Sequence, residues 1–499
     1  MDSAVNFLHE GQKYLQKAVS NILEGRYRTS SEFARKALDL MPSSAEACNA
    51  LGYSLQQLGD PDGACGYYRR AVRLCPSFAE PLNHLGAALT EKENYEEAID
   101  AFERALRLEP EYSEVYNNLA IAFRNIGDFS KAAANLRHVL EIEPDSAEAY
   151  YNLGNTLCEM GRCREAAECY DSAVRLKPDY PQARWNKSFA FFLDGKIAEG
   201  FRQYQWRKDG GLDLFIYPHR YNKPLWDGFP LKGKTILIHY EQGFGDVIQF
   251  LRYVPMVKDL GARVLLEVRA PVAALLKDFK CVDKVIEARL DSAVQEGFDC
   301  YVPLIDLPLI FGTTLETIPA EVPYMTADRS RSEEWSRRIC TNGLNIGLVW
   351  GCKPKDNINR RRNCSLEGLR FLTDIEDINF YGLQKGGEEA TEPDFENKYG
   401  FSNPGADFET FADTAAVIDN LDLVITVDTS VLHLAGAMGK PVWALIPATP
   451  GWRWMLKRED SPWYPTLRLF RQDKLGEWDP VVQRIKKGLL QWEHGNGAT

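Results

Sequence analysis

A proline recurs every 34 residues through the first part of the chain, at Pro42, Pro76, Pro110, Pro144 and Pro178. Alanine keeps the same period at two further places. It lies five residues before four of the prolines, as Ala37, Ala71, Ala105 and Ala173, and twelve residues before four, as Ala64, Ala98, Ala132 and Ala166. Small residues let two helices approach closely, and proline ends a helix before the next one begins. The period therefore predicts a helical hairpin in each unit, with the hairpins stacked along the chain.

Other residues mark where the helices of each unit begin and turn. Leucine followed by glycine or alanine begins the first helix at Leu51, Leu85, Leu119 and Leu153, and Gly25, Gly59, Gly127, Gly161 and Gly195 mark the turns. A 34-residue period with small residues at these places resembles the tetratricopeptide repeat. We count five full repeats over about residues 11–180 and a partial sixth from Pro181. An α-solenoid is expected over residues 1–207.

Asparagine occupies one equivalent position in three repeats, as Asn118, Asn152 and Asn186. Repeat arrays of this kind curve into a superhelix whose concave groove is built from the first helices. One hypothesis is that the three amides bind the backbone of an extended acceptor peptide. The alternative is that asparagine is simply tolerated at a solvated position.

The helical period stops near Trp206. Residues 208–232 are rich in glycine, proline and aromatic residues, which predicts a linker packed between the two halves of the chain. Strands then alternate with helices, as expected for parallel sheets. We expect two Rossmann-like domains of a GT-B fold, residues 233–325 on the acceptor side and 326–499 on the nucleotide-sugar side. A cleft between them would hold both substrates.

Charge and composition narrow the function. The net charge of −12 argues against general nucleic-acid binding or anchoring to an anionic membrane. No stretch approaches the roughly 18 apolar residues of a membrane span, and the first residues show no leader pattern. Eleven cysteines form no CxxC motif, which is typical of a reducing compartment. We expect a cytoplasmic protein.

Residues 421–447 read as strand, tight turn, helix and strand. Asp428, Thr429 and Ser430 interrupt the apolar run where the helix should begin. The N–H groups of a helix that begins at the carboxyl end of a parallel strand can bind a phosphate. Thr429 and Ser430 are therefore the expected diphosphate cradle, whereas Asp428 would repel phosphate and is expected to be structural. The alternative is an ordinary capped turn.

A second candidate segment, EQGFGD, follows the first strand of the α/β half. Gly243 and Gly245 permit a tight turn and close approach to a ligand, although the segment is not a GxGxxG fingerprint. Asp246 begins the next helix at the mouth of the predicted cleft. Its carboxylate can act as a general base or as a helix cap, and the sequence leaves both open.

Cationic residues follow a later strand. Lys353 and the run Arg360 to Arg362 can neutralise a leaving diphosphate, or form an exposed basic loop. His433 lies on the first turn of the helix after Ser430, where it is either a ligand of phosphate or sugar or a structural histidine. The loop 450–460, with its aromatic and charged residues, is a weaker candidate. Seven histidines show no metal-ligand spacing, so no metal is expected.

Four segments, HYEQGFGDVIQFLRYVP, VWGCKP with RRRNCSLEGL, VDTSVLHLAGAMGKPVW and WRWMLKREDSPWYPTLRLFRQ, occur in this order behind the repeats. They resemble glycosyltransferase family 9, the heptosyltransferase-like proteins, and the overall plan resembles that of O-GlcNAc transferases. The resemblance implies inverting, metal-independent transfer from a nucleotide-diphosphate sugar without a further cofactor. It also implies that Asp246 is the base, with Thr429, Ser430, His433 and Lys353 on the donor. From its charge and place in the basic run, Arg362 is a further candidate for the diphosphate.

The sequence departs from the family in three places. Ser430 replaces the glycine usual in heptosyltransferases, the spacing of the lysine differs slightly, and the first Rossmann-like domain is shorter. Only the shorter domain affects the acceptor, because heptosyltransferases normally bind the acceptor there. A protein or peptide acceptor presented by the repeats is therefore expected. The alternative function is a repeat scaffold whose transferase-like half only binds a nucleotide sugar.

Overall fold

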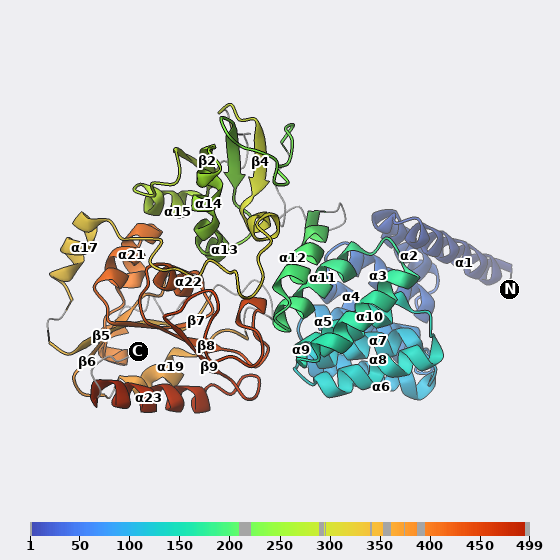
Figure 1. Ribbon diagram of the computed structural model, residues 1–499. Helices are drawn as coiled ribbons and strands as arrows, with labels where there is room; N and C mark the ends of the chain where they lie inside the picture. The colour runs from blue at the N-terminus through green and yellow to red at the C-terminus, as the bar shows by residue number, and fades with distance from the viewer. Residues whose placement is uncertain are drawn as a thin grey trace. The chain divides into compact units, whose positions relative to one another are not determined.

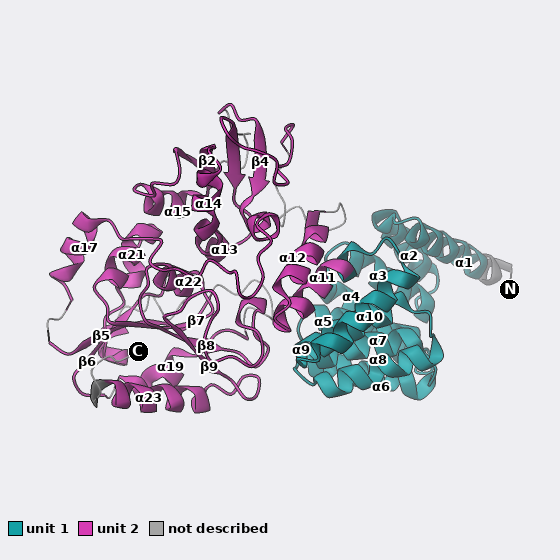
Figure 2. Cartoon of the chain, viewed as in Figure 1, with its two compact units in different colours: residues 1–183 teal, residues 184–499 magenta. Residues whose placement is uncertain are grey.

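The computed structural model describes residues 2–208, 221–288, 294, 296–339, 342–352, 361–373, 375–386 and 395–494. The chain divides into two compact units, residues 1–183 and 184–499 (Figure 2). The first unit is helical and the second is of the α/β class (Figure 1). None of the helices in the described parts is long and apolar enough to cross a membrane.

The first unit is a series of helices in which each packs against the next. The helices are α1 (Asp2–Leu23), α2 (Tyr27–Leu40), α3 (Ala45–Gln57), α4 (Pro61–Leu74), α5 (Glu80–Glu91), α6 (Tyr95–Leu108), α7 (Ser113–Asn125), α8 (Phe129–Ile142), α9 (Ala147–Glu159) and α10 (Cys163–Leu176). A Cβ added to Gly86 on α5 would lie 2.5 Å from the Phe102 ring on α6. The aromatic side chain of the second helix thus packs against the small residue of the first. The predicted α-solenoid is confirmed.

The helical series continues beyond the first unit. Helix α11 (Pro181–Leu193) crosses the division after residue 183, and α12 (Ile197–Tyr204) and η1 (Gln205–Lys208) lie wholly in the second unit. Phe201 of α12 is buried against Phe250 and Trp452 of the α/β part. The last helices of the repeat pattern therefore share a hydrophobic core with the α/β domains. The domain boundaries drawn from sequence stay predictions.

The first α/β domain holds a four-stranded parallel sheet of order β3-β2-β1-β4. Its strands are β1 (Thr235–His239), β2 (Arg263–Val268), β3 (Lys284–Glu287) and β4 (Cys300–Pro303), and its helices are α13 (Phe244–Phe250), η2 (Leu251–Tyr253), α14 (Val254–Asp259), α15 (Ala270–Ala273), η3 (Ala274–Leu276), η4 (Leu304–Asp306) and α16 (Leu307–Ile310). In the described part of the linker, Trp226 is buried and its backbone N–H donates to the Tyr301 carbonyl of β4 over 2.8 Å.

The second α/β domain holds a five-stranded parallel sheet of order β6-β5-β7-β8-β9. Its strands are β5 (Leu344–Val349), β6 (Ile378–Gly382), β7 (Leu423–Val427), β8 (Val442–Ile446) and β9 (Leu467–Arg471). Its helices are α17 (Arg329–Ser336), α19 (Leu366–Leu369), η5 (Arg370–Leu372), α20 (Phe395–Tyr399), η7 (Pro404–Asp407), α21 (Phe411–Asp419), α22 (Ser430–Ala437), η8 (Trp452–Trp454) and α23 (Asp479–His494). The two predicted Rossmann-like domains are confirmed.

Helices cover both faces of the second sheet (Figure 1). Alternate residues of β7 explain this, because Val424 belongs to the core under α22 whereas Ile425 belongs to the core under α23. A strand buried on both faces is mostly apolar, as residues 423–427 are apart from the buried Thr426. In each sheet the chain adds strands on one side of the first strand, β1 or β5, and then continues on its other side. At such a switch point the carboxyl ends of the strands form a binding crevice.

Candidate active site

A cleft of about 600 Å³ lies where the carboxyl ends of the two sheets face each other. Its walls come from the segments after β1 and β2 in the first domain and after β5, β6, β7 and β8 in the second. Seven residues singled out from the sequence line it together: Gly243, Gly245, Asp246, Arg362, Thr429, Ser430 and His433. Lys353 lies outside the described residues. Because all seven were proposed for one site, their convergence makes this cleft the candidate.

The N-terminus of α22 forms one wall of the cleft. Thr429 takes the N-cap position in an extended conformation, and its hydroxyl lies 3.3 Å from that of Thr426 instead of bonding to the helix. Among the described residues, no side chain accepts a capping hydrogen bond at this helix end. The first N–H groups of α22 are therefore available to an anion in the cleft.

Asp246 lies on the opposite wall, in the first turn of α13. Its Oδ2 accepts a hydrogen bond from the Gly243 N–H over 2.9 Å, which caps the helix. Its Oδ1 accepts a hydrogen bond from the Arg453 guanidinium, which comes from the second domain. The carboxylate thus caps its own helix and also bridges the two domains.

The glycine turn before Asp246 also serves the packing of two helices. The left-handed backbone conformation falls on Gln242, with φ 56°, and not on a glycine. Gln242 is held there because its carbonyl accepts a bond from Arg269 over 2.7 Å, and its side chain donates to the Tyr204 hydroxyl over 2.5 Å. A Cβ on Gly245 would lie 2.7 Å from the His433 ring. This glycine therefore allows α13 to approach α22, and not only a ligand.

His433 is buried beneath the cleft. Its Nδ1 lies 2.9 Å from the Tyr464 hydroxyl, and its ring stacks on Trp454. Burial, together with the nearby charge of Arg453, lowers the pKa of His433 to about 3. The imidazole is therefore neutral at ordinary pH, so it can exchange hydrogen bonds with a ligand but cannot supply positive charge to a phosphate.

Asp428 and Arg362 face each other across 3.7 Å at the carboxyl end of β7. Burial works to raise the pKa of Asp428, but the charges of Arg362 and Arg453 outweigh it and leave the pKa below its usual value. A Cβ on Gly451 would lie 2.9 Å from the Asp428 carboxylate, so this loop also rests against Asp428. The expected structural role of Asp428 thus has a concrete form, since it holds Arg362 beside the cleft.

Three further cations line the cleft. Arg269 and Lys385 were not assigned to it from sequence, whereas Arg453 belongs to the loop 450–460, which was a weaker candidate. Arg269 follows β2 directly and its guanidinium lies 4.0 Å from the centre of the Phe244 ring. Lys385 follows β6 and donates to the Glu409 carbonyl over 3.1 Å. Both stand just after a predicted strand, a signal that the sequence carried. For Arg453, the only signal in the sequence was its place in the aromatic loop 450–460.

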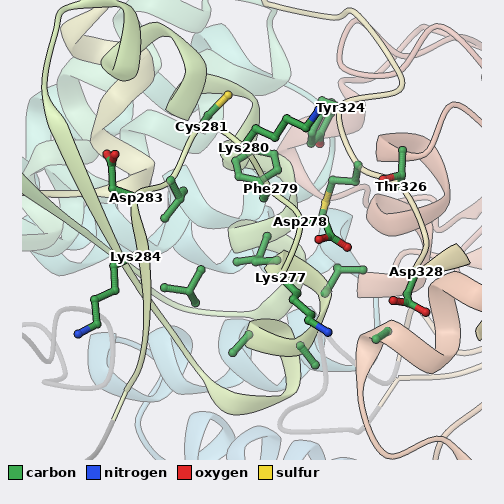
Figure 3. A pocket seen from close by; sticks show the side chains of 18 of the residues that line it. Lys277, Asp278, Phe279, Lys280, Cys281, Asp283, Lys284, Tyr324, Thr326 and Asp328 are labelled. Carbon is green, nitrogen blue, oxygen red and sulfur yellow. The ribbon is translucent and has the colours of Figure 1, made fainter. Parts of the chain in front are cut away.

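A larger cavity of about 780 Å³ is lined by residues of the first domain around 273–287 and by Asp328, Arg331 and Ala412 of the second (Figure 3). Its lining mixes basic and acidic side chains, and several are bound to opposite charges: Asp283 accepts from Lys258 over 2.5 Å, and Arg331 pairs with Asp413. The uncapped end of α22 and Asp246 belong to the smaller cleft. Size alone therefore does not identify the site.

Two asparagines of the predicted acceptor groove bond to other asparagines in the preceding repeat. Asn118 donates to Asn83 and Asn152 donates to Asn117, each over 2.9 Å. Asn117 in turn donates to Glu148 over 3.1 Å. Asn186 lies half-buried on α11. The amides of Asn118 and Asn152 thus join neighbouring repeats, and their binding of an acceptor stays a prediction.

The described residues contain no group of three or more histidine, cysteine, aspartate or glutamate side chains placed to hold a metal ion. Positive charge near the uncapped end of α22 comes instead from arginine. The fold and the cleft together define a class: a tetratricopeptide-repeat protein that carries a glycosyltransferase-like α/β unit.

Comparison with known proteins supports both parts of this class. Residues 45–78, 77–145 and 126–186 match the tetratricopeptide repeat, and residues 409–476 match glycosyltransferase family 9 (heptosyltransferase). The latter segment contains Thr429, Ser430, His433 and Arg453. Asp246 lies outside it.

Among characterised relatives, the chain is 27% identical over 329 residues to Protein FlbA of Caulobacter vibrioides, a match that covers 59% of this chain and 52% of FlbA. The chain thus spans about half the length of this relative. Among solved structures it is similar to Pseudomonas aeruginosa pilF, with TM-score 0.37 and 21% identity over 43% of this chain and 95% of that one. A second is TTC0263, a thermophilic TPR protein of Thermus thermophilus, with TM-score 0.33 and 24% identity over 36% of this chain and 98% of that one.

Proposed function

We propose that the α/β unit is an inverting, metal-independent glycosyltransferase that uses a nucleotide-diphosphate sugar. One observation carries the proposal: the uncapped N-terminus of α22 and the Asp246 carboxylate line the same cleft from opposite domains. An anion site facing a carboxylate is what a diphosphate leaving group and a general base require. The family 9 match over residues 409–476 supports the donor half of the proposal.

The chemical step assigns one task to each wall. Asp246 accepts the proton of the acceptor hydroxyl while the oxygen forms a bond to the anomeric carbon. The bond from that carbon to the diphosphate oxygen breaks, and its electron pair leaves with the diphosphate. The backbone N–H groups of α22 and the guanidinium groups of Arg362 and Arg453 stabilise the negative charge that develops there. Attack from the face opposite the leaving group inverts the anomeric configuration.

The acceptor is proposed to be a protein or peptide bound by the repeats. The first α/β domain is built on only four short strands, and the tetratricopeptide repeats supply a surface of the kind that binds extended segments. The repeat residues proposed for this contact are Asn118, Asn152 and Asn186, acting through backbone groups of the acceptor.

A second candidate function is a repeat scaffold that senses nucleotide sugars without turning them over. The observation that favours it is the state of Asp246, because both of its oxygens accept hydrogen bonds from the protein. A carboxylate engaged in this way has to give up a hydrogen bond before it can accept the proton of an acceptor hydroxyl. The two candidates differ in turnover and not in donor binding.

Calorimetry with UDP-, GDP- and ADP-sugars, followed by a hydrolysis assay on each ligand that binds, separates the candidates. We expect one nucleotide class to bind and to be turned over slowly. Asp246→Asn, which keeps a side-chain oxygen for the helix cap, should lower turnover at least about 100-fold while retaining binding. Asp278→Asn, in the larger cavity, is the matched control and should change neither. Binding without turnover would establish the scaffold, and no binding at all would refute both.

A further inference from the structure

Arg453 is the one described cation of the second domain that is hydrogen-bonded to Asp246. The two residues are 207 positions apart in the chain, and their side chains are only 13% and 16% exposed. Arg453 Nε also bonds to Gln249 of α13, and its guanidinium lies 4.5 Å from the centre of the Trp452 ring. The side chain is therefore fixed at its base by the second domain and held at its tip by the first.

The same guanidinium lies beside the anion site. Arg453 lines the cleft together with Thr429 and Ser430. Its charge acts on two residues around the N-terminus of α22, since it contributes to the lowered pKa of both His433 and Asp428. Arg453 thus stands within electrostatic reach of two anions, the Asp246 carboxylate and any diphosphate bound at α22.

We propose that Arg453 is exchanged between these anions and so couples donor binding to the release of the base. With the cleft empty it binds Asp246. A diphosphate at the N-terminus of α22 attracts the guanidinium, and Asp246 Oδ1 is left free to accept the proton of the acceptor. This inference rests on the proposed function and adds an order to it: the donor binds before the acceptor can be deprotonated.

Physical chemistry favours the exchange. A diphosphate carries more negative charge than a carboxylate and has several oxygens placed for the planar guanidinium fork. The Trp452 ring can support the guanidinium in either position, because cation–π attraction does not depend on one hydrogen-bond direction. Asp246 does not need to move, since its Oδ2 remains bound to the Gly243 N–H. The observed engagement of Asp246 is then the resting state of an enzyme.

The test is a double-mutant cycle on nucleotide affinity. Calorimetry measures the affinity of UDP, GDP, ADP and inorganic pyrophosphate for the unaltered protein, Asp246→Asn, Arg453→Gln and the double variant. We expect Asp246→Asn to tighten nucleotide binding severalfold, because the competing anion is gone, and Arg453→Gln to weaken it at least about tenfold. In the Arg453→Gln background, Asp246→Asn should have little effect.

Simple repulsion between Asp246 and a diphosphate would give a different pattern. In that case Asp246→Asn would tighten binding equally in both backgrounds, and the exchange would be refuted. Equal affinity of the unaltered protein and Asp246→Asn would also refute it. Arg458→Gln is the control, because Arg458 is bound to Asp460 over 2.5 Å and belongs to the same stretch of chain.

Two further outcomes remain distinguishable. If no nucleotide binds the unaltered protein, the proposed function itself fails. If Arg453→Gln does not fold, Arg453→Lys keeps the charge without the fork, and the exchange then predicts a smaller loss of affinity with the Asp246→Asn effect still reduced. An undiminished Asp246→Asn effect in the Arg453→Lys background would overturn the exchange.

Discussion

In the repeat unit Asn152 bonds to Asn117, 35 residues earlier, whereas in the α/β unit Arg453 bonds to Asp246, 207 residues earlier. The difference is general among the described contacts of the two units. Repeat helices pack on their neighbours in the chain, as when the Phe102 ring rests on Gly86. The α/β unit depends on distant pairs, such as Arg252 with the Trp463 carbonyl, 211 residues apart.

This contrast teaches where function can be built. A stack of repeats is stabilised by each hairpin and its neighbours, so a local change stays local. The α/β unit brings its site together from the segments after six strands, so a change at one distant pair reaches the cleft. All eleven tryptophans lie in residues 184–499. Tryptophan fluorescence therefore reports on the second unit alone, and far-UV circular dichroism reports mainly on the helical first unit.

The largest expected effect is in the buried ion cluster of the α/β unit. Arg207 is fully buried and bonds to Glu241 and Asp306, each over 2.6 Å. Burial raises the pKa of Glu241, whereas Arg207 and Lys208 overcome burial and hold the pKa of Asp306 below its usual value. Arg207→Met takes the arginine partner from the buried Glu241 and leaves Asp306 with Lys208 alone, and should lower the free energy of unfolding of the second unit by about 3–5 kcal/mol.

Urea unfolding followed by tryptophan fluorescence measures this loss. Arg202→Met is the matched control, since Arg202 forms an exposed pair with Glu199 on the same helix and should cost less than about 1 kcal/mol. Circular dichroism of the first unit should be unchanged. An equal effect of both variants would contradict a special contribution of the buried cluster.

The next effect is in the repeats. Gly86→Ala places a Cβ 2.5 Å from the buried Phe102 ring and should destabilise the first unit by about 1–3 kcal/mol. Gly66→Ala is the control within the same array, because nothing lies within 4 Å of its Cβ on the exposed face of α4. It should stabilise the unit by about 0.5–1 kcal/mol. Circular dichroism during unfolding measures both, and effects of the same sign would refute the packing argument.

A smaller effect is expected for the asparagine ladder. Asn152→Ala removes the donor to Asn117, which is itself buried, and should cost the first unit about 1–2 kcal/mol. Asn135→Ala is the control, because the Asn135 amide bonds to the Lys131 carbonyl of its own helix, and it should cost less than about 1 kcal/mol. If Asn152→Ala weakens acceptor binding at unchanged stability, the acceptor hypothesis is favoured over a structural role.

The smallest effect is a pH dependence that both units share. The pKa of His433 is about 3 and that of His84 is about 4, both below the ordinary 6.5, mainly because of burial. The unfolded chain therefore binds protons more readily below pH 6.5, and stability falls as pH decreases from there toward the folded pKa. Between about pH 7 and about pH 5.5, His433 should cost the second unit about 1 kcal/mol.

Fluorescence-monitored unfolding at the two pH values measures this slope for the second unit. His433→Gln should flatten it, whereas the slope of the first unit, followed by circular dichroism, should respond only to His84→Gln. A slope of the second unit that is unchanged by His433→Gln would show that other groups control its acid sensitivity.

The sequence alone determined the repeats, the parallel α/β order and most of the residues of the cleft. It could do so because each signal is local: a 34-residue period, an apolar strand, a glycine turn, a strand followed by a helix start. The carboxyl ends of parallel strands meet at one edge of a sheet. Residues just after predicted strands, such as Asp246, Thr429 and Arg362, could therefore be assigned to one site without knowing any distance.

Tertiary structure alone decided what these residues do to one another. It placed the left-handed residue at Gln242, set Gly245 against His433, engaged Asn118 and Asn152 between repeats, and gave Asp246 an arginine partner from the other domain. Only the asparagine contacts follow the repeat period. The others leave no periodic trace in the sequence, because they join segments whose spacing is free to vary. The expected cradle of Thr429 and Ser430 can be predicted from a strand followed by a turn. The position of the Arg453 guanidinium beside it depends on how the two α/β domains pack.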